Sequence, residues 1–202
     1  GWNPGSDPMV ETPPGSGVWL KSFSGMAPNS RHEFKITDGT WNTSFPNANS
    51  WLFADANGDI TISYDVNTYN DGWSPTTERL GLTTDPGSWT ATGDFLAALG
   101  GSNWTNNDPF GLMTPQGNGL HRLAVTLPPG NYEWKAVVTG SWDSISWDAR
   151  SVNTANWSFT TDPVNNQVIF QVNAFAGTAR IDVVPEPAAL LLLAAGLLLR
   201  RR

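Results

Sequence analysis

One stretch of the chain occurs twice, and this repetition constrains the fold more than any other feature of the sequence. Residues Asn131 to Asp143 read NYEWKAVVTGSWD, and residues His32 to Asn42 read HEFKITDGTWN. In both, large or apolar residues alternate with Glu and Lys, and a glycine turn that carries a tryptophan follows. Alternation with period two is typical of a half-buried β-strand. The sequence therefore predicts two copies of a strand that ends in a tryptophan-bearing loop.

The correspondence continues in order on both sides, at a spacing of about 100 residues, which is the size of one β-sandwich domain. We predict an all-β protein of two tandem immunoglobulin-like sandwich modules. Module 1 is expected at 1–68, a polar linker at 69–78, module 2 at 79–183 and a separate segment at 184–202. Module 2 has a leading segment with a strand-like start, Leu80 to Thr84, whereas module 1 begins directly at Trp2. We therefore expect the first module to lack its leading strand and the sequence to lack its natural N-terminus.

Composition supports short strands and a binding surface. Twenty glycines and fifteen prolines with only 14% charged residues favour turns over helices. Eleven tryptophans are more than a core of this size needs, so some should lie at a surface. The chain has no cysteine, which excludes disulfides and thiolate metal sites. Its net charge of −7 argues against nucleic-acid binding.

The repeated strand and loop offer the groups that a carbohydrate site needs. Such a site presents a flat aromatic face to the sugar ring and polar side chains to its hydroxyls. The candidates are Trp142, Trp147, Lys135 and Asn156 in the second copy and Trp41, Lys35 and Asn49 in the first. Two such sites in tandem would reinforce each other on one polymer. The alternative is that Trp142 and Trp41 only fasten their loops to the edge of the sandwich. Trp134 lies on the opposite strand face from Lys135 and is expected in the core.

Catalytic groups do not cluster in the sequence. The two histidines, His32 and His121, fall in strands of different modules, and Glu33 and Glu133 come one per module. A glycosidase needs two carboxylates close together, so no catalytic residue is predicted. The Asp55 to Asp59 stretch hints at a calcium loop but lacks the later glutamate, and an Asn-Gly turn explains it more simply. We predict no cofactor and no metal.

A resemblance adds to this interpretation. The pattern LPPGNYEWK at Leu127 to Lys135, then GSWD at Gly140 to Asp143 and a final Val-Ile-Phe strand, resembles the β-sandwich modules repeated in bacterial pullulanases and starch-binding outer-membrane proteins. It covers most of 79–182 and, less well, 2–66. The chain departs from the pattern at Ile145 to Trp147, where those modules usually have Tyr-Gly, and at Trp157. The resemblance implies a non-catalytic module that binds an α-glucan or an extracellular polysaccharide. The alternative is a structural or adhesive matrix protein that binds no small glycan.

The end of the chain has a separate character. Pro185-Glu186-Pro187 is followed by an apolar run at 188–199 and by Arg200, Arg201 and Arg202. A helix of this run would be about 18 Å long, shorter than the hydrocarbon core of about 30 Å. The tail closely resembles the PEP-CTERM sorting signal, which implies export, transient retention in the inner membrane, and processing by an exosortase that releases or attaches the body at the cell surface. The alternatives are a simple tail anchor and a buried C-terminal helix.

Overall fold

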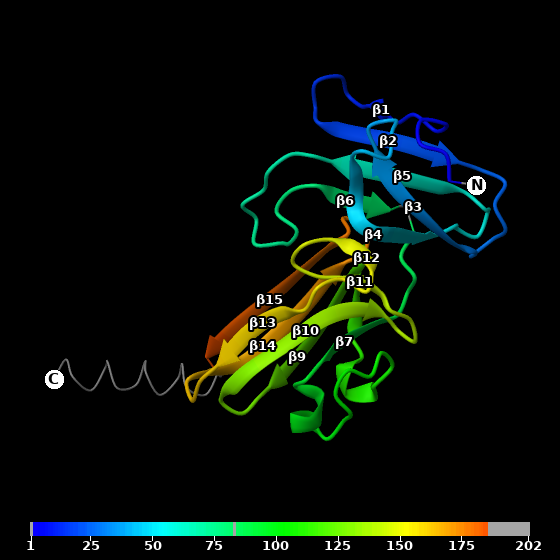
Figure 1. Ribbon diagram of the computed structural model, residues 1–202. Helices are drawn as coiled ribbons and strands as arrows, with labels where there is room; N and C mark the ends of the chain where they lie inside the picture. Colours follow the sequence, from blue (N-terminus) through cyan, green and yellow to red (C-terminus); the bar gives the residue numbers. More distant parts are fainter. Residues whose placement is uncertain (1, 83, 186–202) are drawn as a thin grey trace.

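The computed structural model describes residues 2–82 and 84–185, and this part of the chain is all-β, built from antiparallel sheets without an α-helix (Figure 1). The strands gather in two units that pack directly on each other. The hydrophobic helix predicted at 188–199 lies outside the described residues, as do Glu186, Pro187 and the three terminal arginines. No helix within the described ranges is long and apolar enough to cross a membrane.

The N-terminal unit contains two sheets. One sheet has the order β1-β2-β5-β6, with β1 (Val10–Glu11), β2 (Val18–Phe23), β5 (Ile60–Asp65) and β6 (Arg79–Leu82). The other sheet pairs β3 (Arg31–Thr37) with β4 (Ser44–Phe53). Asp55 shapes the turn from β4 to β5, because its carboxylate accepts from the backbone N–H groups of Asn57 and Asp59, both at 2.8 Å. Gly58 has a φ of 81° there, which fits the predicted Asn-Gly turn. The turn joins two different sheets and is therefore not a hairpin.

The C-terminal unit is the larger of the two, and its hydrophobic interior is more completely covered. Its first sheet contains β7 (Trp89–Gly93), β10 (Gly130–Val138), β11 (Asp143–Ile145), β12 (Arg150–Val152) and β13 (Trp157–Thr161). Its second sheet contains β8 (Thr114–Gly117), β9 (Leu120–Thr126), β14 (Asn165–Asn173) and β15 (Thr178–Pro185). Two short 3₁₀ helices, η1 (Leu96–Leu99) and η2 (Pro109–Gly111), follow β7. Trp134 is fully buried, as predicted, and its ring lies 4.7 Å from that of Phe170.

The strand pairing of the two units follows one plan. The order β1-β2-β5-β6 recurs as β8-β9-β14-β15, and the pair β3-β4 recurs as β10-β13. The register agrees as well, since Glu33 lies opposite Trp51 and Glu133 lies opposite Ser158. The units differ at one edge. In the C-terminal unit β7 pairs with β10, whereas in the described residues no strand other than β4 pairs with β3.

The pairing of β6 differs from the sequence interpretation. Leu80 to Thr84 was expected to begin the second copy, but Arg79–Leu82 pairs with β5, as β15 pairs with β14. Residues 69–78, expected as a linker, form the connection between β5 and β6. Arg79 holds this connection, since its guanidinium donates to the Asp71 carboxylate at 2.7 and 2.8 Å and to the Pro75 carbonyl at 2.8 Å. Alternation within a segment predicts a strand, but it does not specify which other strand that segment will pair with.

The two units are held together by polar and aromatic contacts. Arg31 on β3 donates to both carboxylate oxygens of Asp143 on β11, at 2.7 and 2.6 Å. The Trp51 ring on β4 lies 5.8 Å from the Trp89 ring on β7, and both are buried. Ser50 donates to the carbonyl of Arg150 at 2.8 Å. These contacts fix the relative position of the two units.

Candidate functional site

In the C-terminal unit, the predicted tryptophans lie on turns at the two ends of β11, the strand that pairs with the last part of β10. Trp142 directly precedes β11, and Trp147 lies in the turn between β11 and β12. Their side chains are exposed, Trp142 by 41% and Trp147 by 51%. The indole N–H of Trp147 donates to the carbonyl of Asn156 at 3.1 Å, and the Asn156 amide donates to the Glu133 carboxylate at 2.9 Å. Trp147 is therefore held in a fixed position while half of its surface remains open to solvent.

A row of polar side chains continues from this tryptophan along β10 and β13. Asn131 lies opposite Thr160 and Glu133 lies opposite Ser158, so the four side chains share one face of the sheet. The Thr160 hydroxyl donates to Asn131 at 2.8 Å. A shallow hollow lies along these residues and also touches Asp94. We call Asn131, Glu133, Asn156, Ser158 and Thr160 the polar strip; all five are exposed at the surface.

Lys135 belongs to the same strand face but is only 5% exposed. Its ammonium donates to the carbonyl of Thr154 and, at 3.2 Å, to the side chain of Asn153. Burial lowers the pKa of Lys135, while the nearby charges of Asp148 and Glu133 act in the opposite direction. The geometry gives Lys135 a clear part in holding the loop between β12 and β13. Its contact with a sugar stays a prediction.

The N-terminal unit repeats these hydrogen bonds. The Asn49 amide donates to Glu33 at 2.7 Å, and Lys35 donates to the Pro46 carbonyl at 2.9 Å. The Asn49 bond, together with Arg31, lowers the pKa of Glu33. Trp41 is 50% exposed in the loop between β3 and β4.

The two copies nevertheless differ in how much of this face is open. Trp51 occupies the position of Ser158 and is only 1% exposed, because it packs against the C-terminal unit. Among the residues that the structure describes, a continuous polar strip is therefore open on the C-terminal unit alone.

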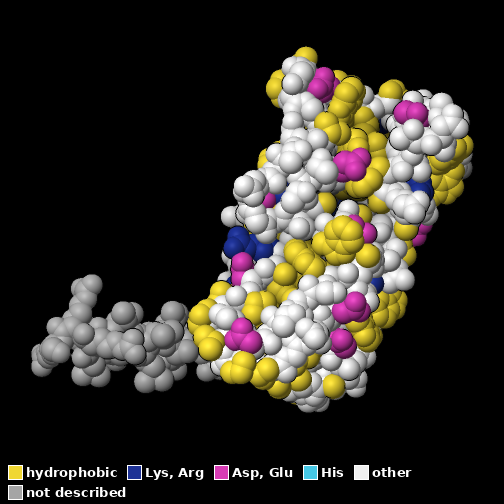
Figure 2. Space-filling model, turned by 60° about the vertical axis from the view of Figure 1, so that its left-hand side comes forward, with side chains coloured by type: hydrophobic (Ala, Val, Ile, Leu, Met, Phe, Trp, Pro, Cys, Tyr) yellow, Lys and Arg dark blue, Asp and Glu magenta, His cyan; other side chains and the backbone are white. Residues whose placement is uncertain are grey.

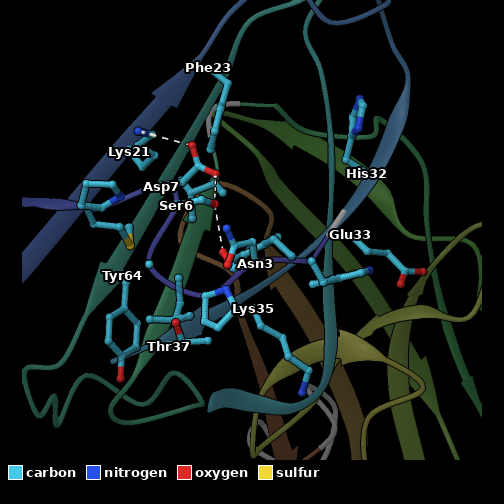
Figure 3. A pocket seen from close by; sticks show the side chains of 18 of the residues that line it. Asn3, Ser6, Asp7, Lys21, Phe23, His32, Glu33, Lys35, Thr37 and Tyr64 are labelled. Atoms are coloured by element: carbon cyan, nitrogen blue, oxygen red, sulfur yellow. Dashed lines mark hydrogen bonds and ion pairs between the residues drawn. The ribbon is translucent and has the colours of Figure 1, made fainter. Parts of the chain in front are cut away.

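Sequence reasoning missed a groove in the N-terminal unit, about 1080 Å³ in volume, that runs between its two sheets. Trp2, Trp19 and Trp41 line it and are 55%, 38% and 50% exposed. Figure 3 shows Phe23 and Tyr64 on one side, Glu33 and Lys35 on the other, and the N-terminal segment between them. The tryptophan count indicated surface positions, but the sequence held no signal for which tryptophans would share a cavity.

The two histidines have structural partners. His121 is 1% exposed, and its Nε2 lies 2.6 Å from the Asp85 carboxylate, which also accepts from the Trp89 indole at 3.1 Å. His32 contacts the Ser30 hydroxyl through Nε2 at 2.7 Å. Within residues 2–82 and 84–185, no three side chains of His, Asp or Glu come close enough together to hold a metal ion.

Comparisons with known proteins point to the C-terminal unit. The profile of the family described as "Pullulanase X25 domain" matches residues 88–178, starting just before β7. The amylopullulanase of Thermoanaerobacter thermohydrosulfuricus is 30% identical over 95 residues, which are 41% of this chain and 6% of that protein. Pullulanase from Bacillus acidopullulyticus is similar in structure with a TM-score of 0.38 and 18% identity, over 62% of this chain and 20% of that one. Residues 88–178 thus form a pullulanase X25-like β-sandwich domain, and the chain spans a small part of the enzymes it matches.

Proposed function

We propose that this protein is a non-catalytic carbohydrate-binding protein whose C-terminal unit holds a neutral polysaccharide along the polar strip, with a sugar ring stacked on Trp147. The observation that carries the proposal is the Trp147 ring, fixed by Asn156 at one end of a row of amide and hydroxyl side chains. A ring already fixed before the ligand arrives loses little conformational freedom on binding. The match of 88–178 to a pullulanase domain favours an α-glucan. An extracellular polysaccharide of the producing cell is the other ligand in this class.

Two finer features belong to the proposal. The N-terminal unit is a second immunoglobulin-like module in tandem with the first, as the repeated strand order supports. Its set of Trp41, Lys35 and Asn49 makes a secondary contact, since its face is partly covered. The protein is also exported and processed at Pro185-Glu186-Pro187, as the order of motif, apolar run and terminal arginines supports.

Binding is tested by isothermal titration and affinity electrophoresis with pullulan, soluble starch and bacterial exopolysaccharide. A sugar that covers the open half of a tryptophan removes about 100 Å² of apolar surface from water, which corresponds to about 2–3 kcal/mol. Trp147→Ala is therefore expected to weaken binding at least tenfold. Phe110→Ala is the matched control, since Phe110 is 48% exposed on η2 and lies outside the strip. Absence of binding to all three polymers would reject the proposal in favour of a structural or adhesive role.

A further inference from the structure

The first copy of the repeated strand pairs its glutamate with an arginine. Arg31 donates to Oε1 of Glu33 at 2.9 Å, and the Asn49 amide donates to Oε2 at 2.7 Å. Both carboxylate oxygens of Glu33 thus have a donor within the protein. The positive charge of Arg31 also offsets the negative charge of Glu33.

The second copy carries an uncharged residue in place of this arginine. Asn131 stands two residues before Glu133, as Arg31 stands two residues before Glu33. Oε1 of Glu133 lies 3.5 Å from the Ser158 hydroxyl, which is the outer limit of a hydrogen bond. Because a carboxylate oxygen can accept two hydrogen bonds, Oε1 retains the capacity to accept one from a ligand.

A second carboxylate stands beside Glu133. Asp94 accepts from the backbone N–H of Glu133 at 2.8 Å and borders the same hollow. Among the described residues that line this hollow, none is basic. Lys135, on the same strand face, is 5% exposed and directs its ammonium to the Thr154 carbonyl. Figure 2 shows acidic side chains spread over the C-terminal unit, in the lower part of the view, and basic ones in few places. The open surface of the polar strip is therefore negative.

A negative strip treats neutral and acidic sugars differently. A sugar hydroxyl can donate to Glu133 as well as accept, and hydrogen bonds to a charged acceptor are the stronger ones. A carboxylate or sulfate on a sugar can only accept, so it has nothing to donate to Glu133. It also carries the same sign of charge as Glu133 and Asp94 and is repelled by both.

We propose that Glu133 and Asp94 are specificity-determining residues that restrict the polar strip to polysaccharides without acidic groups. This inference rests on the proposed function, since it concerns the same site. It narrows the ligand to an α-glucan or another neutral polymer and excludes an exopolysaccharide rich in uronate, sulfate or phosphate. The arginine of the first copy marks the difference, because it neutralises the glutamate where that face is partly covered.

The test compares pullulan with pullulan whose primary alcohols have been partly oxidised to carboxylates. Isothermal titration of the whole protein at low ionic strength should show at least about tenfold tighter binding of the unmodified polymer. The ratio of the two affinities should fall as the ionic strength rises from about 0.01 M to about 1 M, because the Debye length drops from about 30 Å to about 3 Å. A ratio that does not change with salt would overturn the proposal, since it would trace the preference to the lost hydroxyls.

Two variants locate the effect. Asn131→Arg puts an arginine two residues before Glu133, as in the first copy, and should reduce the affinity ratio by at least about fivefold at low ionic strength. Glu133→Gln removes the charge but keeps an acceptor for the Asn156 amide, and it should reduce the ratio in the same direction. The matched control is Asp59→Asn, which removes one charge from an exposed turn of the N-terminal unit and should leave the ratio unchanged.

The outcomes separate this inference from the proposed function. Equal affinity of the natural protein for both polymers would overturn the selectivity and leave the binding of polysaccharide intact. An equal reduction in Asp59→Asn and Glu133→Gln would also overturn it, because the net charge of the protein would then be the cause. Failure to bind either polymer would reject the proposed function, and the selectivity would fall with it.

Discussion

Arg150 offers the sharpest test of the packing between the units. Its side chain is 1% exposed, and none of its three guanidinium nitrogens has a hydrogen-bond partner among the described residues. The cation lies over the rings of Trp51 at 5.0 Å and Phe34 at 5.8 Å, both from the N-terminal unit. Burial lowers the pKa of Arg150 to about 9, and the charge of Asp143 offsets only part of this effect. The folded protein therefore holds a poorly solvated positive charge at neutral pH.

The replacement of Arg150 by methionine keeps most of the volume and removes the charge. A pKa of about 9 in the folded state, far below the ordinary value of an arginine in the unfolded chain, corresponds to an electrostatic cost of about 5 kcal/mol at pH 7. The substitution also removes the two cation–π contacts, which together are worth about 2–4 kcal/mol in a desolvated site. We expect Arg150→Met to raise the free energy of unfolding by about 1–3 kcal/mol, within the range known for buried ions replaced by apolar groups.

The pH dependence gives an independent readout. Above about pH 9, and up to the ordinary pKa of an arginine, the unfolded chain binds this proton and the folded protein does not, so stability rises with pH in this interval. Tyr64 acts in the opposite direction above about pH 10, because burial and Glu78 raise its pKa in the folded state. Lys135, whose pKa burial also lowers, adds a rise in this range to both proteins. Urea unfolding between pH 8 and pH 10 should therefore show a steeper rise for the natural protein than for Arg150→Met.

A matched control separates this effect from loss of any arginine. Arg180 is paired with Asp182 at 2.7 Å at the surface, and Arg180→Met should change stability by less than about 1 kcal/mol. A loss of more than about 2 kcal/mol in Arg150→Met at pH 7 would refute the reasoning, since it would mean that the guanidinium has strong polar partners.

Three further substitutions, the first with a matched control, test contacts between and within the units. Gly177→Ala should lower the free energy of unfolding in urea by more than about 3 kcal/mol, because its Cβ would lie 1.9 Å from the Leu80 carbonyl oxygen at a φ of +64°. The control Gly140→Ala has a φ of +81° and open space around it, so it should lower this free energy by only about 1 kcal/mol. Equal losses would contradict the packing of β6 on the turn at Gly177. Asp71→Asn should lower the free energy of unfolding by about 1 kcal/mol at pH 7, because Arg79 stabilises the Asp71 carboxylate and holds its pKa at about 2. The loss is no larger because this carboxylate is partly exposed to solvent. The difference from the natural protein should vanish as the pH falls from about 4 through 2, and a constant difference would exclude the ion pair as its cause. Arg31→Met should lower the free energy of unfolding by about 2 kcal/mol in the same assay, because it leaves the Asp143 carboxylate, which is 2% exposed, without the two Arg31 donors. An unchanged unfolding midpoint would show that the Arg31–Asp143 pair contributes nothing to stability.

Local pattern made several features predictable. Alternation along 131–138 identified β10 and put Trp134 in the core, because a strand turns successive side chains to opposite faces. The sequence also paired Glu33 with Glu133 and Asn49 with Asn156 in the two copies, and the structure adds that each of these asparagines donates to the glutamate of its own unit. The binding role of these residues stays a prediction.

The repetition and the period-two strands were therefore readable from the sequence, since both depend on residues close together in the chain. The tertiary structure alone decided that β6 joins the sheet of β5, that Trp51 is buried where Ser158 is open, and that the edge of β3 borders a groove. Each of these outcomes rests on contacts between segments far apart in the sequence, such as Arg31 with Asp143 and Trp51 with Trp89. A strand has the same alternating pattern whether its outer face meets solvent or another unit. The sequence therefore indicates which side chains lie on the outer face of a strand, and tertiary packing decides which of these stay exposed.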